Sequence, residues 1–131
     1  PVLLHIRKAH DQAIALLKKY PVTGGIVHAF NGSFQQAEQY QKLGFYFGIG
    51  GAITHPQATR LRSLVTSLPL SSLVLETDSP DMPLHTMTSD RNSPENIPLI
   101  LSTLSKLRQE STEEIAKITT QNCMTLLQLS S

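Results

Sequence analysis

The sequence contains a single cysteine, Cys123, among its 131 residues. One thiol cannot form an intramolecular disulfide, so a disulfide-stabilised scaffold is excluded. No apolar segment approaches the roughly 20 residues that cross a bilayer. The opening PVLLHIRKAH lacks the charged region and the long apolar region of a signal peptide. We therefore expect a cytoplasmic protein that has no membrane partner.

A strong excess of charge of either sign is also absent. The chain has 11 Lys and Arg residues against 10 Asp and Glu residues, which gives a formal net charge of +1. A general basic field for nucleic acid is therefore not indicated, and any contact with nucleic acid would be local to a site. With 40% hydrophobic residues, 16% charged residues and no low-complexity linker, residues 1–131 are predicted to form one domain.

The first residues have an unusual composition for the start of a protein. The chain opens on Pro1, and Val2 already lies in an apolar run that no turn or helix cap precedes. Such an opening is typical of a sequence cut from a longer one. We therefore expect this chain to be a fragment of a larger protein.

Short apolar runs alternate with segments of helical periodicity along the whole chain. The four runs predicted as strands are PVLLH, GGIVHAF, GFYFGIG and SLVLETD. Helices are predicted between and after them, with starts at Ser33, Pro56, Ser93-Pro94 and Ser111. Another helix is predicted within AHDQAIALLKKY, between the first two strands. Its apolar face is predicted to consist of Ala13, Leu16, Leu17 and Tyr20.

The resulting order, β-α-β-α-β-α-β-α-α, predicts an α/β fold with parallel strands and right-handed crossovers. Two architectures have this order: a small doubly wound sheet, or half of a (β/α)8 barrel. A complete barrel needs about 250 residues and eight strand-helix units, and this chain has about half of each. In both architectures, the active site lies at the carboxyl ends of the strands.

Three of the four predicted strands end in a side chain that can bind a metal ion. His5 ends the first strand, His28 ends the second and Asp78 ends the fourth, whereas the third ends in Gly48–Gly51. Two imidazoles and a carboxylate are ligands that Zn, Mn or Fe(II) accept. A metal would also compensate the charge of Asp78, which is costly to bury without a partner. The alternative is that each is a hydrogen-bonded structural residue.

Five motifs in this order carry a family resemblance: PVLLHIR, IVHAFNGS, GFYFGIGGAIT, LVLETDSPDMP and RNSPENI. Together they resemble the second half of the TatD-type metal-dependent deoxyribonucleases, a branch of the amidohydrolase-like barrel hydrolases. The resemblance implies the C-terminal half of a TIM (β/α)8 barrel, strands five to eight with their helices. It also implies two divalent metal ions, Zn, Mn or Mg, and hydrolysis of phosphodiester bonds in DNA.

Roles for individual residues follow from the same resemblance. His5 and His28 would bind one metal ion, and Asp78 would bind the other and orient or deprotonate the attacking water. Glu76 would not bind a metal ion itself but would support the residues that do. The family's His-x-His on the first strand and bridging Glu on the fourth are absent from this chain. The resemblance thus implies a missing N-terminal half-barrel, with which the chain would pair unless it associates with itself, and an inactive fragment.

Several further residues are candidates for contacting substrate. Arg7 lies two residues beyond the first histidine, on the same side of a continued strand, and could clamp a phosphate oxygen; a salt bridge is the alternative. Asn31, Gly32 and Ser33 form a strand-to-helix turn whose N–H groups could hold a phosphate, although an ordinary helix cap also explains Ser33. Arg91 and Asn92 lie in the loop after the last strand, just before Ser93-Pro94, where they could touch substrate, although a capped helix start needs no ligand.

Two other functions fit parts of the sequence. The chain could be a small doubly wound phosphate- or ligand-binding module without catalysis, with Asp78 as an acceptor and the GIGG segment as its contact. It could also be a barrel hydrolase that acts on a different substrate, such as an amide, a lactone or a phosphotriester. Amide hydrolases of this kind usually carry a carboxylated Lys at a strand end, and no Lys ends a predicted strand here. Five motifs in order favour the deoxyribonuclease.

Overall fold

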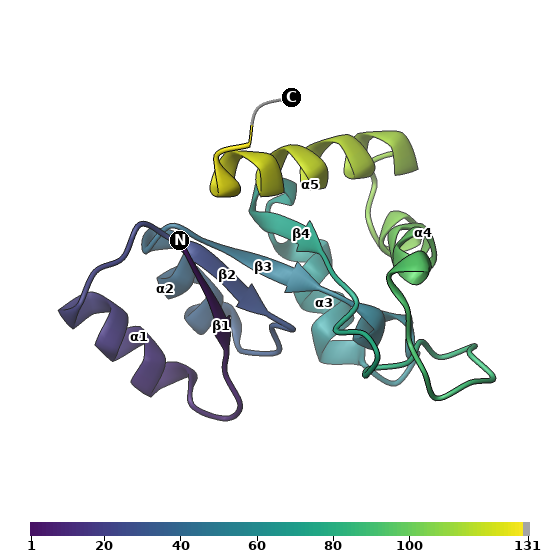
Figure 1. Cartoon of the computed structure of the whole chain (residues 1–131), viewed down its shortest axis with the longest axis horizontal. Helices are drawn as coiled ribbons and strands as arrows, with labels where there is room; N and C mark the ends of the chain where they lie inside the picture. The colour runs from purple at the N-terminus through teal and green to yellow at the C-terminus, as the bar shows by residue number, and fades with distance from the viewer. Residues whose placement is uncertain (130–131) are drawn as a thin grey trace.

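Four parallel strands form a single sheet whose spatial order, β1-β2-β3-β4, follows the sequence (Figure 1). The computed structural model describes residues 1–129. The strands are β1 (Val2–His5), β2 (Gly25–His28), β3 (Phe45–Ile49) and β4 (Leu73–Leu75). The helices are α1 (His10–Lys19), α2 (Phe34–Lys42), α3 (Thr59–Ser67), α4 (Ile97–Leu107) and α5 (Thr112–Leu127), with short 3-10 turns η1 (Gly51–Thr54), η2 (Leu70–Ser72) and η3 (Pro94–Asn96).

The strand order decides between the two predicted architectures. A doubly wound sheet reverses its strand order at a switch point. Here each strand pairs in parallel with the next strand in the sequence, and no reversal occurs. The doubly wound alternative is therefore wrong. The fold is the four-stranded half of a (β/α)8 barrel.

The predicted helix starts at Ser33 and Ser111 are confirmed, whereas Ser93 caps the 3-10 turn η3 and α4 begins only at Ile97. Ser33 caps α2, because its Oγ accepts a hydrogen bond from the Gln36 N–H at 3.1 Å while the Gln36 side chain accepts one from the Ser33 N–H at 2.9 Å. Gly44 follows α2 with a φ of 84°, in the left-handed region that favours glycine. Ser111 caps α5 by accepting from the Glu114 N–H at 3.1 Å.

Two details of the predicted helices are wrong. In α1, Leu17 packs against the core as predicted, but Leu16 and Tyr20 are 58% and 62% exposed, whereas His10 and Ile14 are buried. The reason is that α1 packs beside α2, where the His10 ring hydrogen-bonds to the Tyr40 hydroxyl at 2.9 Å. The third helix begins at Thr59 and not at Pro56, because the chain after β3 first forms the 3-10 turn η1.

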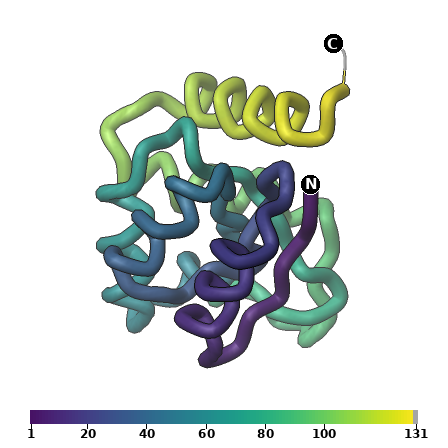
Figure 2. The backbone as a smooth tube through the Cα atoms, turned by 90° about the vertical axis from the view of Figure 1, so that its left-hand side faces the viewer, coloured from purple at the N-terminus to yellow at the C-terminus, as the bar shows by residue number. Residues whose placement is uncertain are grey.

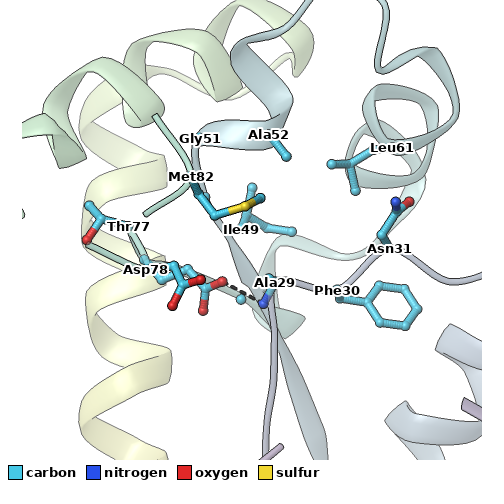
Figure 3. Close-up of a pocket in the computed structure, with 13 residues that line it drawn as sticks. Ala29, Phe30, Asn31, Ile49, Gly51, Ala52, Leu61, Thr77, Asp78 and Met82 are labelled. Carbon is cyan, nitrogen blue, oxygen red and sulfur yellow. Dashed lines mark hydrogen bonds between the residues drawn. The ribbon is translucent and has the colours of Figure 1, made fainter. Parts of the chain in front are cut away.

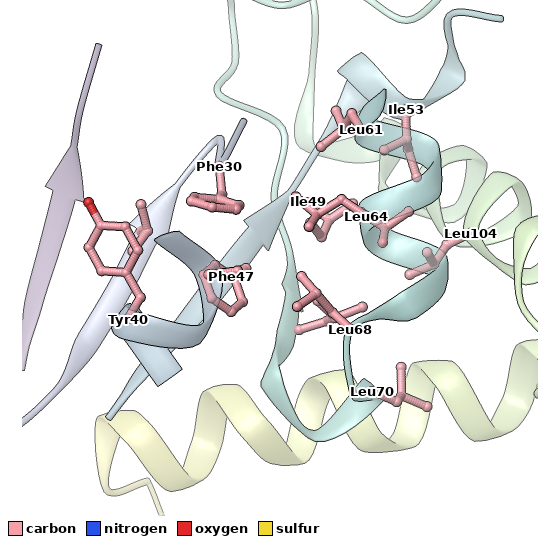
Figure 4. Close-up of a cluster of buried hydrophobic side chains, with 14 of the residues drawn as sticks. Phe30, Tyr40, Phe47, Ile49, Ile53, Leu61, Leu64, Leu68, Leu70 and Leu104 are labelled. Carbon is pink, nitrogen blue, oxygen red and sulfur yellow. The ribbon is translucent and has the colours of Figure 1, made fainter. Parts of the chain in front are cut away.

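The hydrophobic core lies between one face of the sheet and helices α2, α3 and α4 (Figure 4). Tyr40 and Phe47 are fully buried, and the Phe30 ring packs on Phe47 with a centroid separation of 4.7 Å. Helix α5 lies at the amino end of β4, where the Asn122 amide donates to the Leu70 and Leu73 carbonyls (Figure 1). This arrangement leaves the opposite, carboxyl ends of the strands free of α5.

The other face of the sheet is less well covered. Leu3, Ile26 and Tyr46 are aligned across β1, β2 and β3, with Leu3 71% exposed and the other two partly exposed. Strand β1 runs along the outside of the molecule (Figure 2). Parallel sheets are normally covered on both faces. Within residues 1–129, the structure therefore presents an open apolar sheet face.

No helix in that range is both long enough and apolar enough to cross a membrane.

Candidate active site

Two histidines lie side by side at the carboxyl ends of neighbouring strands. His5 ends β1 and His28 ends β2, and the two residues are paired in the parallel register. Their ring centroids are 5.6 Å apart. His5 is exposed, whereas His28 is partly buried. The sheet thus brings together the two imidazoles that the sequence placed at strand ends.

The His28 ring lies between two carboxylates that follow β4. Its Nδ1 is 2.9 Å from Glu76 Oε2, and its Nε2 is 3.2 Å from Asp78 Oδ1. Burial lowers the pKa of His28, but the hydrogen bond to Glu76 and the charges of Glu76 and Asp78 outweigh it, so the pKa is raised above its usual value. Both ring nitrogens of His28 are therefore oriented by the end of the SLVLETD segment.

The second oxygen of Glu76 is also held. Glu76 Oε1 accepts a hydrogen bond from the Ala29 N–H at 2.6 Å, and Ala29 has a left-handed φ of 48°. The carboxylate occupies the space above Gly48, where an added Cβ would lie 2.0 Å from Glu76 Oε2. The glycine of the third strand end thus makes room for the acid that orients His28.

Asp78 is positioned by an unusual backbone conformation. Its φ is 56°, in the left-handed region that aspartate tolerates better than most residues, and its carbonyl accepts from the Asp81 N–H at 3.0 Å. Its side chain is 40% exposed. The carboxylate therefore faces solvent as well as His28, so it can take a further ligand.

The loop after β4 is held in place by Asn92, which is 3% exposed. Its side-chain amide donates to the carbonyls of Thr77, Asp81 and Met82 at 2.9–3.0 Å. The sequence suggested Asn92 as a substrate contact, but its polar atoms are turned into the loop. Asn92 thus fixes the segment that carries Asp78.

The ligand atoms of these residues fit a divalent metal ion, but there are too few of them to complete a metal site. Imidazole nitrogen and carboxylate oxygen are the ligands of Zn and Mn sites, and His28 Nε2 and Asp78 Oδ1 converge to 3.2 Å. Among residues 1–129, however, no group of three or more His, Cys, Asp or Glu side chains is arranged to hold a metal ion. The described residues can supply ligands to a metal centre and cannot complete one.

An apolar cavity of about 140 Å³ opens beside the carboxylates (Figure 3). Phe30, Ile49, Leu61 and Met82 line it, and Asp78 lies at its edge. Apolar walls next to a few polar groups are typical of sites for small organic ligands. A flat apolar group of a substrate could therefore lie next to the carboxylates.

Four of the predicted substrate contacts lie together in a second, polar groove of about 620 Å³. Arg7, Asn31, Gly32 and Ser33 all line it. Because β1 ends at His5, Arg7 lies in a bend and not on a continued strand, so the argument from strand alternation was wrong. The Ser33 hydroxyl is engaged in its helix cap. Arg91 is exposed and lines neither of these two cavities.

Sequence reasoning missed the other two cations of this groove, Lys8 and Arg60. Lys8 follows Arg7 directly, which was the one signal available for it. Arg60 lies on α3, about 30 residues away from the turn that it reaches, and its Nη2 donates to the Asn31 carbonyl at 3.2 Å. A contact between such distant segments has no signature in a single sequence.

Known proteins resemble the chain over nearly its whole length. It is 44% identical over 127 residues to the "Uncharacterized metal-dependent hydrolase YjjV" of Escherichia coli, covering 96% of this chain and 49% of that protein. It is 35% identical to the "3'-5' ssDNA/RNA exonuclease TatD" of Klebsiella pneumoniae, covering 96% of this chain and 51% of that protein. The crystal structure of YjjV, a TatD homolog, matches with a TM-score of 0.91 over 96% of this chain and 49% of its own.

A more distant structure shares the fold alone. The hydrolase TatD family protein of Entamoeba histolytica is 22% identical, with a TM-score of 0.83. The chain spans about half the length of the relatives that it matches. The family model described as TatD related DNase matches residues 1–128. The resemblance predicted from the five motifs is thus confirmed, and the chain belongs to the TatD related DNase family.

Proposed function

We propose that this chain forms part of a metal-dependent hydrolase that cleaves phosphodiester bonds in DNA. The observation that carries the proposal is the His28 ring, held between Glu76 and Asp78 next to His5. Four metal-compatible or metal-supporting side chains meet at the carboxyl ends of parallel strands, where barrel enzymes have their active sites. The names of the E. coli and Klebsiella relatives support a metal-dependent hydrolase and a nuclease respectively.

Each residue has a distinct role in this proposal. His5 and His28 would bind one divalent ion, and Asp78 would bind a second, with Zn, Mn or Mg as the candidate metals. Glu76 fixes the orientation of His28 through Nδ1, so that Nε2 is the nitrogen directed toward the metal centre. Asp78, with its exposed carboxylate, orients the attacking water or takes its proton.

A phosphodiester needs such a centre because its own negative charge repels a nucleophile. When bound, two divalent cations would supply charge neutralisation at the phosphate and a lower pKa for the attacking water. The remaining ligands would come from polypeptide that covers the open face of the sheet, since the described residues do not complete a metal site. In this proposal, that polypeptide is the N-terminal half of the same barrel.

A barrel hydrolase with another substrate is the second candidate. The apolar cavity beside Asp78 would also accept the hydrocarbon part of an amide or lactone. The polar groove next to it carries Arg7 and the turn at Ser33, which suit an anionic ligand better than a neutral one. This groove favours the phosphodiester.

The experiment joins this chain to the half of E. coli YjjV that it does not match, which restores a full-length barrel. We expect Mn-dependent, chelator-sensitive cleavage of labelled single-stranded DNA by the fusion and none above background by the 131-residue chain alone. Asp78→Asn in the fusion should reduce kcat by a large factor, because the amide keeps the size of the side chain and loses its charge. Asp81→Asn, three residues further along the same loop, is the matched control and should retain activity.

Two outcomes would contradict the proposal. One is metal-dependent cleavage by the chain alone that His28→Ala abolishes, since the site would then need no further ligands. The other is a folded Asp78→Asn fusion with unchanged kcat, which would make Asp78 a structural residue. A fusion that hydrolyses an amide or a lactone but no phosphodiester would support the second candidate.

A further inference from the structure

The polar groove is basic, and its charges come from three separate parts of the chain. Arg7 and Lys8 lie in the bend after β1, and Arg60 lies in the first turn of α3. One carboxylate, Asp11, lines the groove with them, and it accepts a hydrogen bond from the Gln36 side chain at 3.1 Å. Burial lowers the pKa of the adjacent His10, so this ring adds no charge near neutral pH. The lining thus has a formal charge of +2.

None of these three cations forms an ion pair among the described residues. The ion pairs formed among residues 1–129 involve His28 and Arg108, and none includes Arg7, Lys8 or Arg60. All three side chains are exposed. Three cations that converge on a groove with a single carboxylate, Asp11, repel one another, and an anion in the groove would reduce that repulsion.

The backbone around the groove is also suited to an anion. Helix α1 begins here, and its N-cap residue, Ala9, provides no side-chain hydrogen bond to the first turn. The N–H groups of that turn are therefore available to a ligand, and the amino end of a helix favours negative charge. Lys8 has a left-handed φ of 53°, which is uncommon for lysine and marks a bend held in a specific shape.

The groove adjoins the cavity of the candidate active site. Ala29 and Asn31 line both the polar groove and the apolar cavity beside Asp78. Arg60 Nη2 fixes this shared wall, because it donates to the carbonyl of Asn31 at 3.2 Å and to its Oδ1 at 3.3 Å. A ligand could therefore extend from the carboxylates across Asn31 to the three cations.

We propose that the groove lined by Arg7, Lys8 and Arg60 is a second anion subsite, which binds a phosphate adjacent to the one being cleaved. The identity of this ligand rests on the proposed function, while the existence of an anion subsite rests on the groove alone. The consequence is a preference for a polyanionic strand over a ligand with one phosphodiester. Lys8 and Arg60 are binding residues of this subsite, and Arg60 also positions the Asn31 wall.

Binding of a 5′-labelled single-stranded dT octamer to the chain, followed by fluorescence anisotropy in EDTA, tests the subsite without any hydrolysis. Lys8→Gln and Arg60→Gln should each weaken binding several-fold and reduce the slope of log K against log[salt] by about 0.7, the value for one phosphate contact in a single strand. Lys42→Gln, the same charge change at the far end of α2, is the control and should bind as wild type does. Circular dichroism checks that each variant is folded.

Arg60→Lys separates charge from geometry. It should retain the salt slope and lose part of the affinity, because lysine cannot reproduce the guanidinium contacts to Asn31. In the fusion described above, Arg60→Gln should raise KM for the octamer, whereas Lys42→Gln should change neither this KM nor the hydrolysis of bis-p-nitrophenyl phosphate, which carries a single phosphodiester.

The inference is overturned if wild-type chain and fusion do not bind the octamer, if both Gln variants bind it as wild type does, or if Lys42→Gln weakens binding equally. Failure of the proposed function looks different. In that case the octamer still binds through Lys8 and Arg60, and no phosphodiester is hydrolysed by the metal-loaded fusion.

Discussion

At the residue scale, the candidate site depends on one glycine as much as on its acids. Gly48 has no side chain, and the Glu76 carboxylate uses the vacant space to reach both His28 and the Ala29 N–H. Any side chain at position 48 would push this carboxylate aside, because Glu76 is the flexible partner of the contact. Gly48 thus helps to orient His28, because it leaves room for the Glu76 carboxylate.

Gly48→Ala should therefore behave like the loss of the Glu76 carboxylate. We expect it to lower the free energy of unfolding by about 1–3 kcal/mol, the range for removing buried or charged hydrogen bonds. In a Glu76→Ala background the same change should cost far less, since the clash is gone, and urea unfolding of the four proteins in this cycle measures the difference. Additive costs would show that Gly48 and Glu76 act independently.

A second residue-scale feature is the buried His10, whose ring hydrogen-bonds to Tyr40. Burial lowers the pKa of His10, with a smaller opposing effect from Asp11, and it raises the pKa of Tyr40 to about 12. The Tyr40 hydroxyl therefore keeps its proton across the physiological range. His10 is neutral in the folded chain under conditions in which an exposed histidine begins to take up a proton.

This difference predicts a loss of stability in mild acid. Because the pKa of His10 is lower in the folded state, the unfolded chain binds more protons below about pH 6.5, and stability falls as the pH drops through that value. His28, whose pKa is raised, contributes with the opposite sign. Urea unfolding of wild type and His10→Gln at about pH 7.5 and 5.5 isolates the His10 part. An equal pH dependence in both proteins would contradict the prediction.

At the element scale, the loop between β4 and α4 owes its shape to Asn92. Its amide nitrogen donates to three carbonyls, and its Oδ1 accepts from the Ser93 N–H at 2.8 Å and the Asn96 amide at 2.8 Å. The hydrogen bonds of this one side chain thus take the place of the regular backbone hydrogen bonds of a strand or helix. The loop carries Asp78, so its order determines where that carboxylate points.

Asn92→Ala should loosen this loop more than it destabilises the whole chain. We expect a loss of about 1–3 kcal/mol in the free energy of unfolding, because several buried carbonyls lose their donor. Residues 79–91 should become sensitive to limited proteolysis under native conditions. Ser89→Ala, in the same loop, is the control. Unchanged proteolysis in a folded Asn92→Ala protein would mean that the loop is held by other contacts.

The elements themselves were largely predictable from the sequence. Capping boxes and apolar runs are local signals, which is why the starts of α2 and α5 and all four strands were predicted correctly. The buried face of α1 was predicted only in part, because the periodicity of the apolar residues admits both the Leu16–Tyr20 side and the His10–Ile14 side. The packing of α1 against α2 decided between them, and that contact is not local.

In the candidate site, too, some residues were predictable from the sequence and others were not. His5, His28 and Asp78 were placed at one edge by the rule that parallel strands end together, and the structure brings them there. The groove residue Arg60 could not be found in this way, since it meets Asn31 only through the tertiary fold. Strand-end residues are predictable because the sheet aligns them, whereas helix residues that reach across are not.

At the scale of the whole molecule, the open sheet face has the largest consequence. Leu3 is 71% exposed on an edge strand whose outer N–H and C=O groups have no sheet partner among residues 1–129. Exposed apolar side chains on an unpaired parallel edge promote association. The chain spans about half of its relatives, and the unmatched half of such a barrel would cover this face.

We therefore predict that the isolated chain associates with itself and that the fusion with the unmatched half of YjjV does not. In light scattering at micromolar concentration, the isolated chain should have a mass above 14.4 kDa, whereas the fusion should be monodisperse. Leu3→Lys should shift the isolated chain toward the monomer, because a charge on the edge strand opposes pairing. Leu99→Lys is the matched control, since Leu99 is 51% exposed on α4, away from the sheet edge. If the wild-type chain is a monodisperse monomer, or if Leu99→Lys has the same effect as Leu3→Lys, the open sheet face is not the surface through which the chain associates.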